Sequence, residues 1–197
     1  MDFDFTDEQN MVRDGISRLI REEYDFDTRR GVVASESGWR PELWAQLAEL
    51  GMLAAPFSEE DGGFGGAGFD INVLFEELGR GLVVEPFVAS ALLGGTMLSE
   101  LGNGEQKAII AEVISGNTLL AISHAEPDSF YDLAHVETTA TKDGDNWVLN
   151  GRKAVVLNGD TADQLIVTAA GRPYVRNIAA RIDPAFQTAQ NQHSQAV

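Results

Sequence analysis

The sequence predicts an α+β protein, in which an α-helical bundle (residues 1–116) precedes an incomplete antiparallel β-barrel domain (residues 117–170). Apolar residues recur at helical spacing in the first part and alternate at strand spacing in the second. The second part also contains Asp143-Gly144 and Asn150-Gly151. Such pairs favour hairpin turns, because both turn positions need a positive φ.

The first helices are predicted from their ends and their apolar faces. Thr6 and Gln9 form a capping box at the start of the first helix. A loop containing "SESGWR" separates it from a second helix, which Pro41 begins and Gly51 ends. Asp70 caps a third helix. The three apolar faces consist of Met11, Val12, Ile16, Leu19 and Ile20, then Leu43, Trp44, Leu47 and Leu50, then Ile71, Leu74, Phe75 and Leu78.

Two more helices complete the predicted bundle. The stretch "GRGLVVEP" ends the third helix, and a strongly apolar helix from Phe87 to Leu98 follows. The stretch "GNGE" ends that helix, and a fifth one closes before Gly116. Five amphipathic helices joined by short breaks are typical of an α-helical bundle.

The apolar pattern changes to a period of two after the bundle. "TLLAISHA" (118–125) and "DQLIVTAA" (163–170) read as strands, and "VETTATKDGDNWVLNGRKAVVL" reads as three strands joined by the two turns. We expect antiparallel pairing throughout, with sheet edges left exposed. Residues 171–197 do not continue the alternation, so we expect an atypical, poorly ordered tail.

Composition limits the classes of function. Asp and Glu number 31 and Lys and Arg 14, which gives a net charge of −17, so nucleic acid and anionic membranes should repel the chain. There is no cysteine for thiolate chemistry or disulfides. No apolar run approaches the ~18 residues of a membrane span, and the N-terminus lacks a signal-peptide pattern. We expect a cytoplasmic protein.

One glycine-rich stretch matches a cofactor fingerprint by its letters. Gly63, Gly65 and Gly68 have the G-x-G-x-x-G spacing of a dinucleotide-binding turn. That turn requires a preceding strand and a βαβ unit. Here a helix end and three acidic residues (59–61) precede it. The stretch therefore indicates a corner between helices, where alanine at Gly65 or Gly68 should reduce stability.

The sequence offers no signature for metal binding or acyl-enzyme chemistry. His124, His135 and His193 lack ligand spacing with one another, and no G-x-S-x-G motif is present. We therefore expect no metal site. His124, alone in a predicted strand, is expected to be a core or cleft residue.

A family resemblance rests on three ordered motifs. The chain reads "AEPDSFYD" at 125–132, "NGRKAVVLNG" at 150–159 and "AD" at 162–163. These resemble the T-E-P-G-A-G-S-D, N-G-x-K-x-W-I-T-N-G and A-D motifs of the acyl-CoA dehydrogenase family. "LWAQLAELGMLAAPFSEEDGGFGG" and "FEELGRGLVVEPF" look like the family's N-terminal helical domain. The resemblance covers residues 1 to about 170 and looks closest to small subunits of pimeloyl-CoA dehydrogenases.

The resemblance implies a fold and a reaction. The family has a helical domain, a β-barrel middle domain and a C-terminal four-helix domain, and we expect this chain to lack the last. The implied reaction is α,β-dehydrogenation of an acyl-CoA thioester with electrons passed to FAD. Because the family's catalytic base lies in the C-terminal domain, we expect the isolated chain to be inactive and to contain no catalytic residue.

The resemblance also implies partners and leaves alternatives open. The expected partners are an acyl-CoA substrate and acyl-CoA dehydrogenase-type subunits, in a homo- or hetero-oligomer. One alternative is a non-catalytic partner subunit that completes a sibling acyl-CoA dehydrogenase. Another is a related flavin enzyme, such as an oxidase or a flavin-dependent monooxygenase.

Site residues follow from the matched motif positions. The resemblance implies FAD contacts at Ile122, His124, Ala125, Val155 and Leu157, and a substrate contact at Tyr131. Ala125 and Leu157 stand where the family has hydroxyl donors, and Val155 stands where it has a stacking indole. The resemblance assigns Glu126 to fixing the turn, so we reject it as the base.

Overall fold

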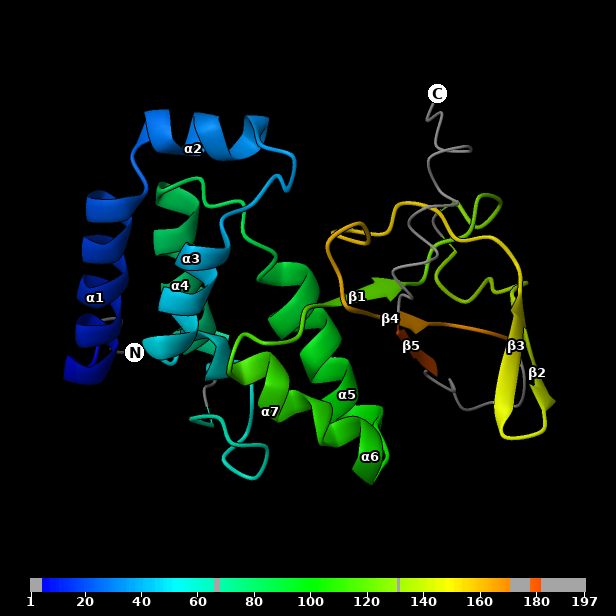
Figure 1. Ribbon diagram of the computed structural model, residues 1–197. Coiled ribbons are helices and arrows are strands. Elements are labelled where there is room, and N and C mark those ends of the chain that lie inside the picture. The colour runs from blue at the N-terminus through cyan, green and yellow to red at the C-terminus, as the bar shows by residue number, and fades with distance from the viewer. Residues whose placement is uncertain (1–4, 66–67, 131, 171–177, 182–197) are drawn as a thin grey trace. The chain divides into compact units, whose positions relative to one another are not determined.

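The computed structural model describes residues 5–65, 68–130, 132–170 and 178–181. The chain divides into two compact units, residues 1–117 and 118–197; the first is helical, and the described strands lie in the second (Figure 1). Within the described residues, no helix has the length and apolar character that a membrane span requires.

Helix α1 (Asp7–Glu23) begins at the predicted capping box. The Thr6 hydroxyl accepts a hydrogen bond from the Gln9 amide at 3.2 Å, and the Gln9 side chain accepts one from the Thr6 amide at 3.0 Å. The side-chain amide of Gln9 also donates to Asp70 at 2.9 Å. Asp70 lies in the first turn of α4 (Gly68–Arg80) rather than at its cap. The capping box therefore also joins α1 to α4, which pack side by side (Figure 1).

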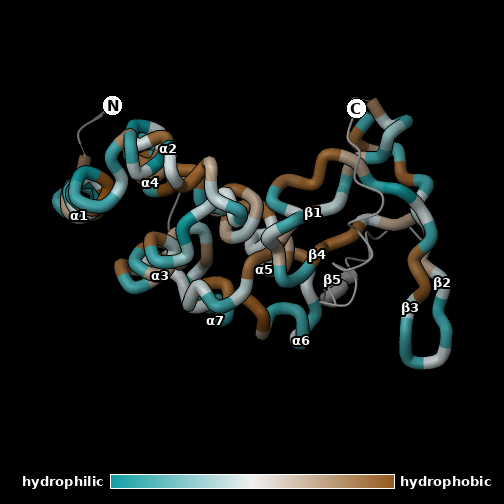
Figure 2. The backbone as a smooth tube through the Cα atoms, turned by 45° about the horizontal axis from the view of Figure 1, so that its top comes forward, coloured by the Kyte–Doolittle hydropathy of each residue, from teal (hydrophilic) through white to brown (hydrophobic). Residues whose placement is uncertain are grey.

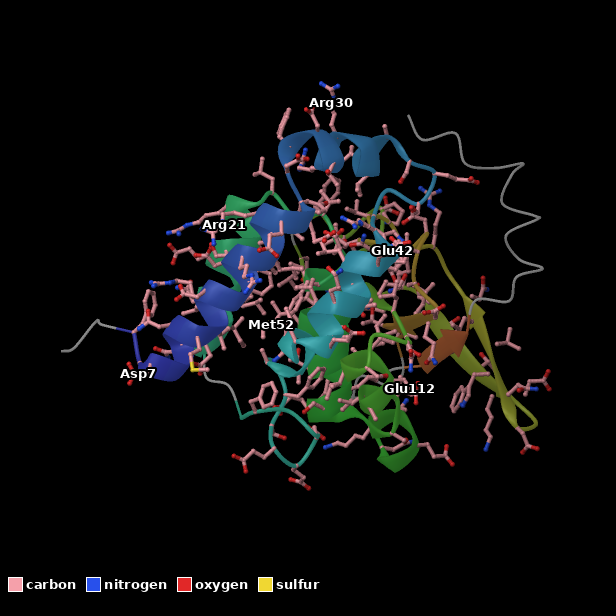
Figure 3. All side chains as sticks on the ribbon, turned by 60° about the vertical axis from the view of Figure 1, so that its left-hand side comes forward. Asp7, Arg21, Arg30, Glu42, Met52 and Glu112 are labelled. Carbon is pink, nitrogen blue, oxygen red and sulfur yellow. The ribbon has the colours of Figure 1, made fainter. Side chains whose placement is uncertain are left out.

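Helix α2 (Phe26–Ala34) occupies a segment that the apolar pattern did not predict to be helical. Asp25 caps it by accepting from the Thr28 amide at 2.8 Å. None of its residues is buried, and Arg30 extends away from the other helices (Figure 3). Because no apolar stripe faces a core, periodicity gives no signal for this helix.

Helix α3 (Pro41–Glu49) begins at Pro41, as predicted, and buries Leu43, Trp44 and Leu47. Gly51 follows with φ +74°, a left-handed conformation that ends the helix. A short 3-10 helix, η1 (Met52–Ala54), comes next.

The apolar segment after α4 is not one continuous α-helix. The chain forms a π-helix, η2 (Val88–Gly95), followed by α5 (Thr96–Leu101), α6 (Gly104–Lys107) and α7 (Ile109–Ile114). The Thr96 hydroxyl donates to the Leu92 carbonyl at the π-to-α junction. Gly95 faces the Phe57 ring so closely that an added Cβ would lie 2.8 Å from a ring carbon. The predicted fifth helix corresponds to α6 and α7.

The strands of the second unit form two sheets. They are β1 (Leu120–Ser123), β2 (Thr139–Asp143), β3 (Asn146–Asn150), β4 (Gln164–Val167) and β5 (Ile178–Arg181). β1 pairs with β4 in parallel, β4 pairs with β5 antiparallel, and β2 and β3 form a hairpin with a hydrophilic tip (Figure 2). The all-antiparallel prediction is therefore wrong for β1 and β4, and the described strands close no barrel. Alternation marks a strand but not its partner's direction.

The two turn signals have different outcomes. The hairpin predicted at Asp143-Gly144 is confirmed, but its turn lies one residue later. Asp143 pairs with Asn146, the turn residues are Gly144 and Asp145, and Gly144 has φ +59°. The Asn150-Gly151 pair starts no hairpin, because residues 151–157 form no strand. Strand β5 lies in the segment expected to be a poorly ordered tail, and the rest of that segment, 171–177 and 182–197, lies outside the described residues.

Two glycines of the glycine-rich corner are needed for different reasons: Gly63 lies too close to other backbone atoms for a side chain, and Gly65 has a positive φ. A Cβ on Gly63 would lie 2.6 Å from the Ala54 carbonyl oxygen and would also clash with the Phe57 carbonyl. Gly65 has φ +67°. A Cβ on Gly68 would meet nothing within 4 Å, so the expected loss of stability at Gly68 has no structural basis.

We predict that Gly63→Ala lowers the free energy of unfolding by about 2 kcal/mol, because the Cβ displaces backbone. Gly65→Ala should cost about 1–2 kcal/mol through left-handed strain. Gly68→Ala is the matched control and should be neutral or stabilising by less than about 1 kcal/mol. Urea unfolding of the three variants measures this order. Equal losses at all three positions would contradict it.

Candidate functional site

The motif segments meet at the ends of strands β1 and β4. The Ala154 amide donates to the Ala125 carbonyl at 2.8 Å, which joins the loop after β3 to the loop after β1. The Thr168 amide donates to the Ser123 carbonyl at 3.2 Å, directly after β4. Backbone hydrogen bonds thereby hold the residues after β3 and the residues after β4 against the end of β1 and the loop that follows it.

Glu126 is the most heavily hydrogen-bonded side chain of this region. It is 6% exposed and accepts from the Glu137 amide (2.7 Å), the Thr138 amide (2.9 Å), the Thr138 hydroxyl (2.7 Å) and the Lys153 ammonium (2.8 Å). Burial by itself would raise the pKa of this carboxyl, but Lys153, Thr138 and the two amides outweigh burial and hold the pKa well below its usual range. An ionised carboxylate surrounded by donors is a structural acceptor and a poor base.

Lys153 uses all three of its ammonium donors. Besides Glu126, it donates to the His124 carbonyl at 3.2 Å and to the Thr168 hydroxyl at 2.9 Å. Its side chain is 9% exposed. His124 and Glu126 lie in the loop directly after β1, and Thr168 directly follows β4. One side chain therefore connects two other segments to its own.

Gly151 allows Lys153 to reach this position. A Cβ on Gly151 would lie 2.6 Å from the Thr138 Cα and would also clash with the Thr138 hydroxyl. The glycine of the Asn150-Gly151 pair is therefore needed for close approach rather than for a hairpin turn.

The loop after Lys153 is strained and apolar. Val155 has φ +52° and Asn158 has φ +53°. A β-branched residue in the left-handed region is a genuine outlier, which costs about 1–3 kcal/mol and is often found at functional sites. Val155 is 85% exposed and Leu157 56% exposed. The segment therefore presents apolar side chains and a strained backbone at the surface of the unit.

The structure places the predicted site residues around this loop. Ile122 is half-buried in β1 opposite Ile166, and the carbonyls of His124 and Ala125 bind Lys153 and Ala154, respectively. Val155 and Leu157 lie on the exposed loop. Tyr131 lies outside the described residues.

Sequence reasoning did not give a role to three residues that organise the site: Thr138, Lys153 and Thr168. Lys153 belongs to the N-G-x-K motif, so the motif itself was a signal for it. Thr138 and Thr168 lie in no quoted motif position, and only their contacts with Glu126 and Lys153 identify them.

One cluster has the composition of a metal site. Ligand atoms of Glu126, His135 and Glu137 lie within 4.8 Å of one another. However, the Lys153 ammonium already contacts Glu126, and its positive charge opposes a bound cation. We therefore assign no metal to this cluster.

Comparison with known proteins gives the family. The model for the acyl-CoA dehydrogenase N-terminal domain matches residues 6–117, and the model for the middle domain matches residues 121–182. The chain therefore belongs to the acyl-CoA dehydrogenase family. The probable acyl-CoA dehydrogenase YngJ of Bacillus subtilis is 31% identical over 173 residues, which are 86% of this chain and 45% of that protein.

Solved structures agree with this assignment. A variant of the Tcur3481-Tcur3483 steroid ACAD is similar with a TM-score of 0.79 and 30% identity, over 89% of this chain and 48% of that chain. PigA, solved with FAD and proline, has a TM-score of 0.78 over 92% of this chain and 49% of that chain; at 24% identity it shows the shared fold. The chain spans less than half the length of the curated relatives it matches.

We predict that Glu126→Gln lowers the free energy of unfolding by about 3 kcal/mol at neutral pH, because it leaves Lys153 buried without a counter-charge. The pKa of Glu126 is lower in the folded protein than its ordinary value of 4.5. Its stabilising contribution is therefore complete above about pH 4.5 and is lost as the pH falls through the folded-state pKa.

Urea unfolding of wild type and variant between pH 7 and pH 3 checks this prediction, and the gap between them should narrow below pH 4.5. Glu137→Gln removes the same charge from a side chain that is 72% exposed, so it should change stability little. A gap that stays constant with pH would show that the charge of Glu126 is not what stabilises the fold.

Proposed function

We propose that this chain is an acyl-CoA dehydrogenase-type flavoprotein subunit, which contributes to the α,β-dehydrogenation of an acyl-CoA thioester. The observation that carries the proposal is the strained, exposed segment at Val155–Leu157, held beside Ala125 at the motif positions that the family resemblance assigns to FAD. When bound, FAD accepts the electrons of the reaction.

The residues present fit a flavin through apolar surface and backbone. Exposed Val155 and Leu157 offer apolar contact for a planar ring system, and burying them would remove apolar surface from water. Ala125 and Leu157 supply no hydroxyl, so at these two positions hydrogen bonds to a ligand come from the backbone. Ile122 and His124 belong to the same strand end and complete the proposed contact set.

Glu126 is not a suitable base at this loop. Glu126 is buried and ionised, and its oxygens accept four hydrogen bonds. We therefore propose that proton abstraction depends on a group outside this part of the chain, and that the chain acts in an oligomer with acyl-CoA dehydrogenase-type subunits. Tyr131 is the proposed contact to the acyl-CoA substrate.

A second function, that of a non-catalytic partner subunit completing a sibling enzyme, is favoured by one observation. Phe130 is 87% exposed and Leu133 is 76% exposed, on the loop that carries the altered motif. The two residues are three positions apart in the sequence, and large exposed apolar side chains that gather in a patch are typical of protein interfaces. In this case the altered loop would bind a sibling subunit instead of holding its own flavin.

We predict that the purified chain binds FAD and shows no dehydrogenase turnover with acyl-CoA and an artificial electron acceptor. Val155→Asp should weaken FAD binding about tenfold, because it places a charge against an apolar ring system. Flavin fluorescence titration measures the affinity. Val148→Asp is the control, since Val148 is 53% exposed on the β2–β3 hairpin.

Two outcomes would redirect the proposal. Absence of FAD binding by wild type would contradict the flavoprotein function and favour the partner-subunit function. Robust turnover by the chain alone would contradict the dependence on an outside base.

A further inference from the structure

Val155 needs surroundings that hold it in its conformation. A valine at φ +52° persists only where neighbouring structure determines the backbone, because the left-handed region is unfavourable for β-branched residues. Its side chain is 85% exposed and gains little from burial within its own unit. The restraint must therefore come from the residues on either side of it.

On the N-terminal side, the restraint is Lys153 together with Ala154. The Lys153 ammonium is bound to the His124 carbonyl, the Glu126 carboxylate and the Thr168 hydroxyl, and the Ala154 amide is bound to the Ala125 carbonyl. Four hydrogen bonds thus fix the two residues immediately before Val155 to the ends of β1 and β4.

On the C-terminal side, the restraint is a tight turn. The Gly159 amide donates to the Val156 carbonyl at 3.2 Å, and the Thr161 and Ala162 amides donate to the Asn158 carbonyl at 3.2 and 3.1 Å. Both ends of the segment 154–158 are therefore tied, and the turn bonds are all local. Farther along the chain, the Asp163 carboxylate accepts from the Leu119 amide at 2.8 Å, just before β1. The Lys153 side chain lies next to the strained residue and connects it to the segments that follow β1 and β4.

We propose that Lys153 is a positioning residue, which holds segment 154–158 in its strained conformation so that its backbone and apolar side chains face the flavin. This inference rests on the proposed function. It explains how the loop keeps a defined surface although Ala125 and Leu157 carry no hydroxyl to orient a cofactor. In this proposal a buried ammonium, which does not itself touch the flavin, helps to hold the conformation of the loop.

The test uses Lys153→Met and Thr168→Val in the full chain. Lys153→Met removes the ammonium, whereas Thr168→Val removes one of its three acceptors. Lys142→Met is the matched control, because Lys142 is exposed on β2 and loses the same charge. Amide hydrogen exchange without FAD, followed at the hydrogen-bonded amides of Ala154, Gly159, Thr161 and Ala162, measures the order of segment 154–158. Flavin fluorescence titration measures FAD affinity.

We expect Lys153→Met to speed exchange of the bonded amides at and after Ala154 at least tenfold relative to the paired amides of β1 and β4, and to weaken FAD binding about tenfold. Thr168→Val should have a smaller effect of the same kind, and Lys142→Met none. If exchange rises equally throughout the unit, Lys153 only stabilises the fold. If exchange is unchanged, Lys153 does not position the loop. Each of these results would overturn the proposal.

The exchange measurement separates this proposal from the proposed function. If wild type does not bind FAD, the flavoprotein function fails, and with it the assignment of the loop to the flavin. Selective loosening of 154–158 in Lys153→Met would still establish the positioning role. If wild type binds FAD and Lys153→Met binds it equally well, the proposed function stands and the positioning proposal fails.

Discussion

The buried pair of Glu126 and Lys153 organises the second unit of this chain. Removing two opposite charges from water is expensive, and their attraction offsets that expense only where the remaining donors and acceptors are also satisfied. Here the carboxylate accepts four hydrogen bonds and the ammonium donates three. The pair joins residues 27 positions apart, so the loop after β1 and the loop after β3 cannot move independently.

Three other residues, Gly151, Thr138 and Thr168, make the pairing of Glu126 with Lys153 possible. Because Gly151 has no side chain, the backbone can pass close to Thr138. Thr138 donates hydrogen bonds from its hydroxyl and its amide to Glu126. Thr168 follows β4 and accepts from Lys153, which connects the pair to the sheet. The glycine and lysine of the N-G-x-K motif, Gly151 and Lys153, therefore act together, although the contacts they make are with distant parts of the chain.

The motif positions that differ from the family pattern include residues of the strained loop after Lys153. The positions where the family resemblance expects hydroxyls and an indole hold small or aliphatic side chains, yet the loop is still held in a conformation that valine does not favour. Recognition by a held backbone does not depend on which side chains occupy those positions. In the proposed function, the loop would contact the flavin through this held backbone, without the side-chain groups that the resemblance leads one to expect there.

The sequence by itself determined the local elements. The capping box at Thr6, the burial of Leu43, Trp44 and Leu47 on α3 and the β2–β3 hairpin all depend on residues a few positions apart, and the structure confirms them. Leu50, predicted on the same face of α3, is 47% exposed. Other features depend on distant partners. Helix α2 has no buried face to give it a pattern, and the parallel pairing of β1 with β4 joins strands that alternate just as antiparallel ones do. The three contacts of Lys153 span up to 29 positions, so only the tertiary structure could decide them, because hydrogen bonding across such separations requires the fold already to have brought the segments together.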